Sequence, residues 1–242
     1  MSALFAFSTL LLLETVEEAA QALQTRRAHG RQIHLQQHLA GPAAQHLVHP
    51  GDAVGHQLAA AVAATIDQVS IIGADQRITA LPEFAELYST QPGTDWNRLG
   101  RSFPGTEEIP VAAGAEENLL CLESDRYEGE DMFIRDFGWT IRRFGIATAD
   151  PRLDRSIEDA YIRAIAAGLW QNTIAEVNSD QYWAEGVQSF FDANNEETDE
   201  RDQVHNQIDT RDELREYDPL LYGLLVEVFG ETEWRPECAS GA

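Results

Sequence analysis

Two stretches of sequence decide the fold: residues 130–145, EDMFIRDFGWTIRRFG, and residues 179–192, SDQYWAEGVQSFFD. In the first stretch the apolar residues recur every three or four positions, which is typical of a helix with one buried face. These residues are Phe133, Ile134, Phe137 and Ile141. The second stretch is rich in aromatic residues and also reads as a helix. The two stretches therefore predict a pair of helices that pack together.

The remaining patterns predict more helices and a few short strands. Apolar runs at 69–74 and 109–114 favour strands, and NLLCL at 118–122 is a third strand candidate. Prolines and glycines mark helix ends and loops. Further helices are expected at 3–24, 53–66, 82–88, 151–167 and 218–229, with loops around 40–52 and 91–106. The predicted class is α+β, dominated by helices.

The chain is strongly acidic and contains no lysine. Its 242 residues include 41 Asp and Glu against 17 basic residues, all of them Arg, for a net charge of −24. Such a surface repels phosphate backbones and anionic membranes, which excludes nucleic-acid binding as an expected function. The acid excess favours a halophilic protein that stays soluble at high salt. A GC-rich genome is the alternative explanation for the missing lysine, although it does not explain the excess of acids.

The composition changes near residue 60, which predicts that the chain divides there into two parts. Residues 1–60 hold six of the seven histidines, whereas residues 61–242 hold 37 acids against 14 Arg. We expect 1–60 to be a His-rich helical pro-segment or linker and 61–242 to be the acidic body. His34 and His38 have the spacing of a helical zinc pair, but Leu35 stands where a catalytic Glu belongs. His205 is expected to be solvated.

The cysteines and apolar segments leave the location of the protein open. Cys121 and Cys238 form either one disulfide or two unrelated thiols. The apolar run at 3–13 has the length of a signal-peptide core, but it runs directly into acidic residues. No stretch reaches the roughly 18 apolar residues that span a bilayer. Export and a cytoplasmic location are both compatible with these features.

Four segments together resemble one known family: QYWAEGVQSFFDANNE (181–196), NQIDTRDELREYDPLLYGLLVEVFG (206–230), ENLLCLESDRYEGEDMFIRDFGWTIRRFGI (117–146) and IGADQRITALPEFAEL (72–87). The first two resemble the C-terminal part, and the last two the upstream part, of secreted zinc metallopeptidases of the gluzincin type. These peptidases are similar to the anthrax lethal-factor-like catalytic domain. The resemblance covers roughly residues 68–235. It implies a metallopeptidase-like domain with a small sheet and two facing site helices.

At the site positions, the chain departs from the family pattern. The family carries H-E-F-x-H on the first helix, where two histidines one turn apart bind zinc and the Glu activates water. This chain reads Arg135-Asp136-Phe137-Gly138-Trp139, while Tyr182-Trp183-Ala184-Glu185 keeps the pattern of the later helix. An arginine and an indole offer no lone pair to a cation. The resemblance therefore implies a lost zinc site and no cofactor.

These substitutions lead to a specific structural expectation. We expect Arg135 to pair with Glu185 in place of the metal, with Trp139 filling the remaining space. Asp136 is expected either to be a second, weaker partner of Arg135 or to turn to solvent. Tyr182 is expected to face the former cleft. The predicted function is a catalytically inactive binding or structural module whose partner is an unidentified protein or peptide. The alternative is a metal-independent hydrolase using Asp136, Glu185 and Tyr182, although Arg135 is expected to hold both carboxylates ionised.

Overall fold

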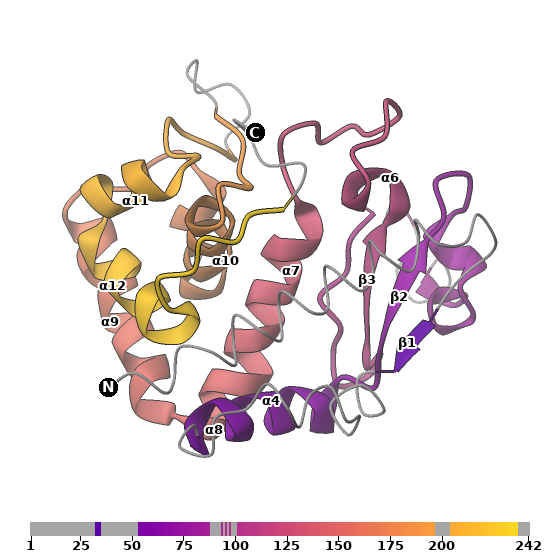
Figure 1. The fold of residues 1–242 in the computed structure, drawn as a ribbon, viewed down its shortest axis with the longest axis horizontal. Helices are drawn as coiled ribbons and strands as arrows, with labels where there is room; N and C mark the ends of the chain where they lie inside the picture. Colours follow the sequence, from indigo (N-terminus) through magenta and orange to yellow (C-terminus); the bar gives the residue numbers. More distant parts are fainter. Residues whose placement is uncertain are drawn as a thin grey trace.

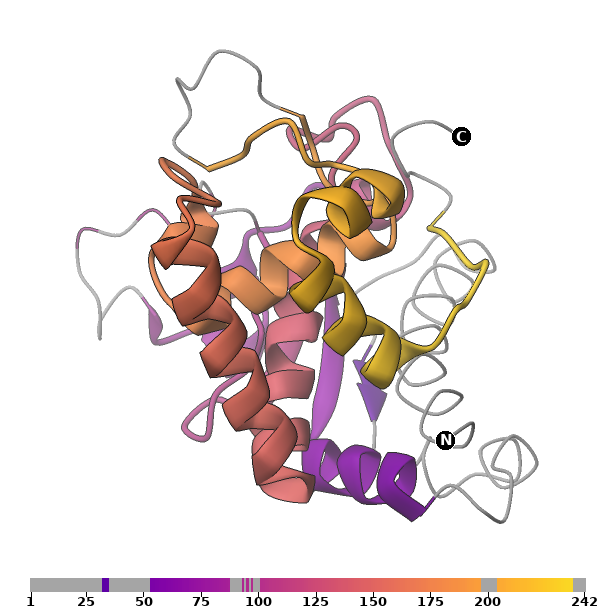
Figure 2. The ribbon, with the colours of Figure 1, turned by 90° about the vertical axis from the view of Figure 1, so that its left-hand side faces the viewer.

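The computed structural model describes residues 32–34, 53–87, 93, 95, 97, 101–196 and 204–236. Over these residues the protein is α+β and dominated by helices, as expected from the sequence. A small sheet lies at one side of the molecule and a group of helices lies at the other, with one long helix between them (Figure 1). The view turned by 90° shows the same order of layers (Figure 2).

The sheet has the strand order β1-β2-β3, in which β1 is antiparallel to β2 and β2 is parallel to β3. The strands are β1 (Gln32–His34), β2 (Gln68–Ile72) and β3 (Val111–Ala115). All residues of β2 and β3 are buried, which suits parallel strands covered on both faces. His34 thus lies in strand β1, and His38, the other residue of the expected zinc pair, lies outside the described residues.

Helix α4 lies between β1 and β2 in the chain, and the helices from α6 onward follow β3. Their bounds are α4 (Ala53–Thr65), α6 (Glu116–Leu119), α7 (Met132–Thr140), α8 (Ala147–Ala149), α9 (Pro151–Ala166), α10 (Ser179–Phe190), α11 (Arg211–Tyr217) and α12 (Pro219–Phe229). Short 3-10 turns span Ile78–Ala80, Pro82–Phe84 and Ile174–Glu176, and a π-helical segment, Ile141–Ile146, continues α7. The helices expected at 53–66, 130–145, 151–167, 179–192 and 218–229 are confirmed.

Some sequence-based expectations need correction. NLLCL is not a strand, because Glu116–Leu119 forms helix α6. The region expected as a helix at 82–88 forms a 3-10 turn at Pro82–Phe84. Helix α4 crosses residue 60, and Leu58 and Ala59 are buried in the same core as the acidic body. The packed body therefore begins before residue 60. The helix expected at 3–24 lies outside the described residues.

A buried arginine of the π-helical segment, Arg142, forms ion pairs with the neighbouring helices. The Arg142 side chain is 5% exposed and forms ion pairs with Asp154 (3.1 Å) and Glu158 (3.6 Å) on α9, and with Asp180 (3.2 Å) on α10. Its Nη2 atom also donates to Ser179, the first residue of α10. Because three carboxylates share one cation, Arg142 joins α9 and α10 to the end of α7.

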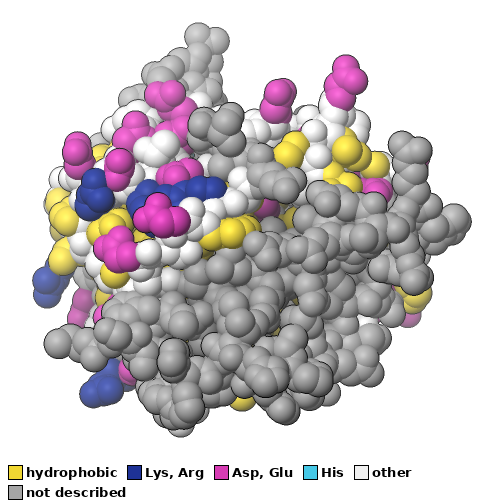
Figure 3. All heavy atoms as spheres, viewed as in Figure 1, with side chains coloured by type: hydrophobic (Ala, Val, Ile, Leu, Met, Phe, Trp, Pro, Cys, Tyr) yellow, Lys and Arg dark blue, Asp and Glu magenta, His cyan; other side chains and the backbone are white. Residues whose placement is uncertain are grey.

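The outer surface carries many carboxylates. Figure 3 shows Asp and Glu side chains projecting from the described part of one face, with a few arginines among them. Among the described helices, none is both long enough and apolar enough to cross a membrane.

Candidate functional site

The candidate site lies where α7 and α10 pack together, and local chemistry fixes their approach. Asp131 caps α7, its Oδ1 atom accepting from the Ile134 amide at 3.0 Å. Further along α7, a Cβ atom added to Gly138 would lie only 2.8 Å from Val187 on α10. The Trp183 indole also donates to the Gly138 carbonyl at 3.1 Å. Glycine at 138 thus lets the two helices approach closely enough for Arg135 to reach Glu185.

Arg135 and Glu185 form a buried ion pair across the two helices. Arg135 Nε lies 2.7 Å from Glu185 Oε1, and the two side chains are 15% and 1% exposed. A second guanidinium nitrogen donates to the Gln181 side chain, and Asn194 Nδ2 donates to Glu185 Oε2 at 3.4 Å. Both oxygens of the Glu185 carboxylate are therefore contacted by protein donors. The pairing expected from the sequence is confirmed.

Asp136 is the weaker partner of Arg135, with its Oδ1 atom 3.4 Å from Arg135 Nη1. Burial raises the pKa of Asp136 and of Glu185, while the nearby guanidinium opposes the shift in both. Burial alone would lower the pKa of Arg135, but the Glu185 and Asp136 carboxylates raise it above its usual value. In both acids burial has the larger effect, so the net pKa shift is upward although Arg135 favours the ionised form.

Of the two aromatic candidates, Tyr182 is placed differently from the expectation. It is fully buried beside Trp170 and Tyr161, and its hydroxyl donates to Asp218 at 2.8 Å. Burial and the Asp218 carboxylate raise the pKa of this phenol. Tyr182 is therefore a core residue directed toward α9 and α12, which corrects the expectation that it faces a cleft. Trp139 is half-buried and packs edge-to-face on Phe144, with 5.9 Å between the ring centroids.

The structure adds residues that sequence reasoning missed. Glu130, with a side chain 4% exposed, lies 3.3 Å from Nε2 of His205, whose side chain is 10% exposed. Gln188 on α10 donates to Glu130 Oε1 at 3.3 Å and to the Asp131 carbonyl at 3.1 Å. His205 is thus part of the buried polar cluster and is not solvated, which corrects the expectation. The only hint in the sequence was its isolation as the single histidine of the acidic body.

The site does not fit zinc. Positions 135 and 139 carry side chains without a metal-binding lone pair, and the guanidinium of Arg135 already contacts the remaining carboxylate, that of Glu185. Across the described part of the chain, no group of three or more His, Cys, Asp and Glu side chains is arranged to hold a metal ion. Cys121 is disulfide-bonded, which favours the disulfide alternative; Cys238 lies outside the described residues.

Comparisons with protein-family models, with curated proteins and with solved structures find no match to this chain. The interpretation of the site therefore depends on its own residues and geometry.

Asp131 predicts a pH dependence of stability. Its side chain is buried at the start of α7, and burial raises the pKa of Asp131 to about 6 from 3.8. A folded-state pKa above the unfolded value gives stability that is full at low pH and is lost as the pH rises through about 6. Ionisation of Asp131 should lower the free energy of unfolding by roughly 1 kcal/mol between pH 5 and pH 7. Urea unfolding at both pH values, at constant salt, measures the loss.

Asp131→Asn is the matched control, because asparagine keeps the helix cap and does not titrate. The variant should lose the part of the pH dependence that comes from Asp131. It should keep the part that comes from Asp136 and Glu185, whose raised pKa values also make the protein less stable as the pH rises. Equal pH dependence in the variant and the natural protein would show that Asp131 titrates normally.

Proposed function

We propose that this protein is a non-catalytic relative of zinc metallopeptidases that acts as a binding or structural module. The observation that carries the proposal is the Arg135–Glu185 pair, with 2.7 Å between Arg135 Nε and Glu185 Oε1. In the resembled family a zinc ion provides the positive charge beside this carboxylate. Here a permanently charged guanidinium on the facing helix provides it instead.

The same geometry speaks against the hydrolase alternative. A general acid or base must come within hydrogen-bond reach of the substrate. Glu185 is 1% exposed and both of its carboxylate oxygens are contacted by protein groups. Tyr182 is bonded to Asp218 in the aromatic core. Of the three residues proposed for metal-independent hydrolysis, Asp136 alone keeps some exposure, with 15% of its side chain accessible.

Zinc analysis of the purified chain tests this proposal. We expect no stoichiometric zinc by elemental analysis and no hydrolysis of casein at high salt, because the ligand positions hold a competing cation. Intact mass measured on the same sample shows whether residues 1–60 are retained. One tightly bound zinc ion per chain would overturn the proposal, and zinc-free, active protein would favour the hydrolase alternative.

A restored variant tests the register of the proposed family match separately. Arg135→His combined with Asp136→Glu and Trp139→His rebuilds the H-E-F-G-H pattern opposite Glu185. If α7 derives from a zinc helix, this variant should bind about one zinc per chain. The matched control keeps the three substitutions and adds Glu185→Gln, which should weaken the zinc binding. A restored variant that takes up no zinc would contradict the family register and leave the ion pair itself unaffected.

A further inference from the structure

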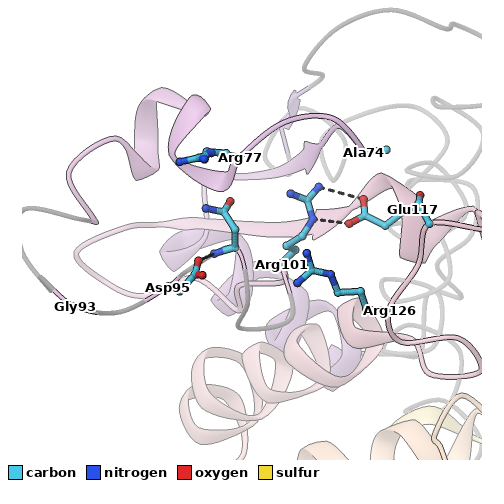
Figure 4. A pocket seen from close by; sticks show the side chains of 9 residues that line it. Ala74, Arg77, Gly93, Asp95, Arg101, Glu117 and Arg126 are labelled. Atoms are coloured by element: carbon cyan, nitrogen blue, oxygen red, sulfur yellow. Dashed lines mark hydrogen bonds and ion pairs between the residues drawn. The ribbon is translucent and has the colours of Figure 1, made fainter.

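A polar cavity of about 640 Å³ lies at the carboxyl ends of β2 and β3 (Figure 4). Ala74 follows β2 and Glu117 follows β3, and both line the cavity. The carboxyl ends of parallel strands are a common place for ligand sites, because the connecting loops leave a crevice there. The cavity shares no residue with the Arg135–Glu185 site, so a ligand bound in it is independent of the proposed function.

One wall of the cavity is a fixed ion pair. Arg101 is 9% exposed and binds Glu117 through two nitrogens, at 2.5 Å to Oε1 and 3.1 Å to Oε2. The same guanidinium donates to the carbonyls of Gln76 at 2.5 Å and Gly73 at 2.9 Å. Because its donors are engaged by these four oxygens, Arg101 holds the loop after β2 against α6. This pair shapes the cavity and contributes little net charge to it.

Two further arginines in the cavity have no such partner. Arg77 lies on one side of the cavity and Arg126 on the other, with Arg101 between them in the view of Figure 4. Both side chains are exposed, and within the described part of the chain neither has an ion-pair partner. Among the described residues that line the cavity, Asp95 is the other acid, and its Oδ1 atom accepts from the Asn97 amide at 3.2 Å.

The charge of the cavity is opposite to that of the chain. The described lining residues include three arginines and the two carboxylates of Asp95 and Glu117, a net charge of +1 in a protein whose net charge is −24. A cavity with a net charge focuses the electrostatic field and attracts ions of the opposite sign. A guanidinium presents paired donors that match a carboxylate or a phosphate. In a chain that repels anions overall, this cavity is a local exception.

We propose that the cavity binds a small oxyanion, a carboxylate or a phosphate group, between Arg77 and Arg126. The free guanidinium groups hold the anion, and the Arg101–Glu117 pair keeps the surrounding loops in place. The Asp95 carboxylate repels an anion, which limits the negative charge of a ligand that the cavity can bind. The volume of about 640 Å³ admits a small organic molecule that carries the anionic group.

Calorimetric titration tests the proposal with two probes, inorganic phosphate and succinate. Each is titrated separately at one salt concentration at which circular dichroism shows the protein folded. The probe that binds more tightly identifies the class of anion, and binding of either supports the site. Arg77→Gln and Arg126→Gln should each weaken binding roughly tenfold. Asp95→Asn should strengthen it, because the substitution removes a negative charge from the cavity.

Arg155→Gln is the matched control. Arg155 is an exposed residue of α9 that does not line the cavity, and its substitution changes the net charge by the same amount. Binding in this variant should stay within about twofold of the natural protein. The inference is overturned if neither probe binds at about 10 mM. It is also overturned if the cavity variants bind as tightly as Arg155→Gln, since the effect would then come from net charge alone.

Discussion

Replacing Arg135 with glutamine should lower the free energy of unfolding by about 3–5 kcal/mol. The substitution leaves Glu185, 1% exposed, without its cationic partner, and Asn194 at 3.4 Å is a weaker substitute. An unpaired charge in the interior costs several kcal/mol or forces the group to take up a proton. Urea unfolding of both proteins at the same salt concentration measures the difference.

The chain offers a control with the same chemistry at the surface. Arg215 Nη2 also lies 2.7 Å from a carboxylate, that of Asp212, but the two side chains are 51% and 79% exposed. Arg215→Gln should lower the free energy of unfolding far less than Arg135→Gln does, because water screens the exposed pair. Equal costs for Arg135→Gln and Arg215→Gln would show that burial does not decide the value of the Arg135–Glu185 pair.

The cost of Arg135→Gln should also depend on pH. Burial raises the pKa of Glu185, and Arg135 opposes that rise, so removing Arg135 should raise the pKa further. At lower pH the carboxyl becomes neutral, and the penalty for leaving it unpaired becomes smaller. The double variant Arg135→Gln, Glu185→Gln removes both charges and should recover much of the stability at neutral pH. A cost that stays constant from pH 5 to pH 7 would contradict this explanation.

The ion pair was predicted from two things together, the apolar spacing of the first helix and the register that the resemblance implies. The apolar spacing around Phe137 sets the buried face of α7, and position 135 lies on the adjoining face. If the resemblance holds, the carboxylate at 185 stands beside a metal in the resembled family, and without that metal it needs another cation, which the arginine at 135 provides. Arg135 and Glu185 are 50 residues apart, so this step also required the facing of the two helices that the resemblance implies.

The polar cluster around the pair was not predictable, because its members come together only in the folded chain. Glu130 and His205 are 75 residues apart in sequence, and no local pattern links them. The direction of the Asp136 pKa shift has the same origin: Arg135 is adjacent to Asp136 in sequence, whereas the burial that raises the pKa arises only in the folded chain. Tyr182 was misplaced because its partner Asp218 caps α12, 36 residues later.

Short apolar runs caused the main error in secondary structure. NLLCL has the composition of a buried strand, and periodicity over five residues does not separate strand from helix. Two acids, Glu116 and Glu117, stand in the first turn, where they favour a helix start. The Asn118 side chain then accepts from the Met132 amide at 2.9 Å and donates to the Glu130 carbonyl at 2.6 Å. Asn118 on helix α6 thus holds the beginning of α7 in place, a contact that the strand expected here did not predict.

Raising the KCl concentration from 0.1 M to 2 M should raise the thermal midpoint by roughly 10 °C, equivalent to several kcal/mol for a chain of this size. Residues 61–242 carry 37 acids against 14 Arg, and acidic side chains project from the described surface (Figure 3). Repulsion among them opposes the compact state in dilute buffer. At molar salt the screening length falls to about 3 Å, which is shorter than the spacing of most surface charges.

Salt also strengthens apolar burial, so a charge-reduced variant is needed to separate the two effects. Glu107, Glu108, Glu123 and Asp159 are exposed acids that can be replaced together by their amides. If repulsion is the cause, this variant should melt higher than the natural protein at 0.1 M KCl and gain less from 2 M KCl. A midpoint that stays level or falls with salt in the natural protein would refute adaptation to high salt. An identical gain in both proteins would assign the effect to apolar burial, and the missing lysines would then reflect codon composition alone.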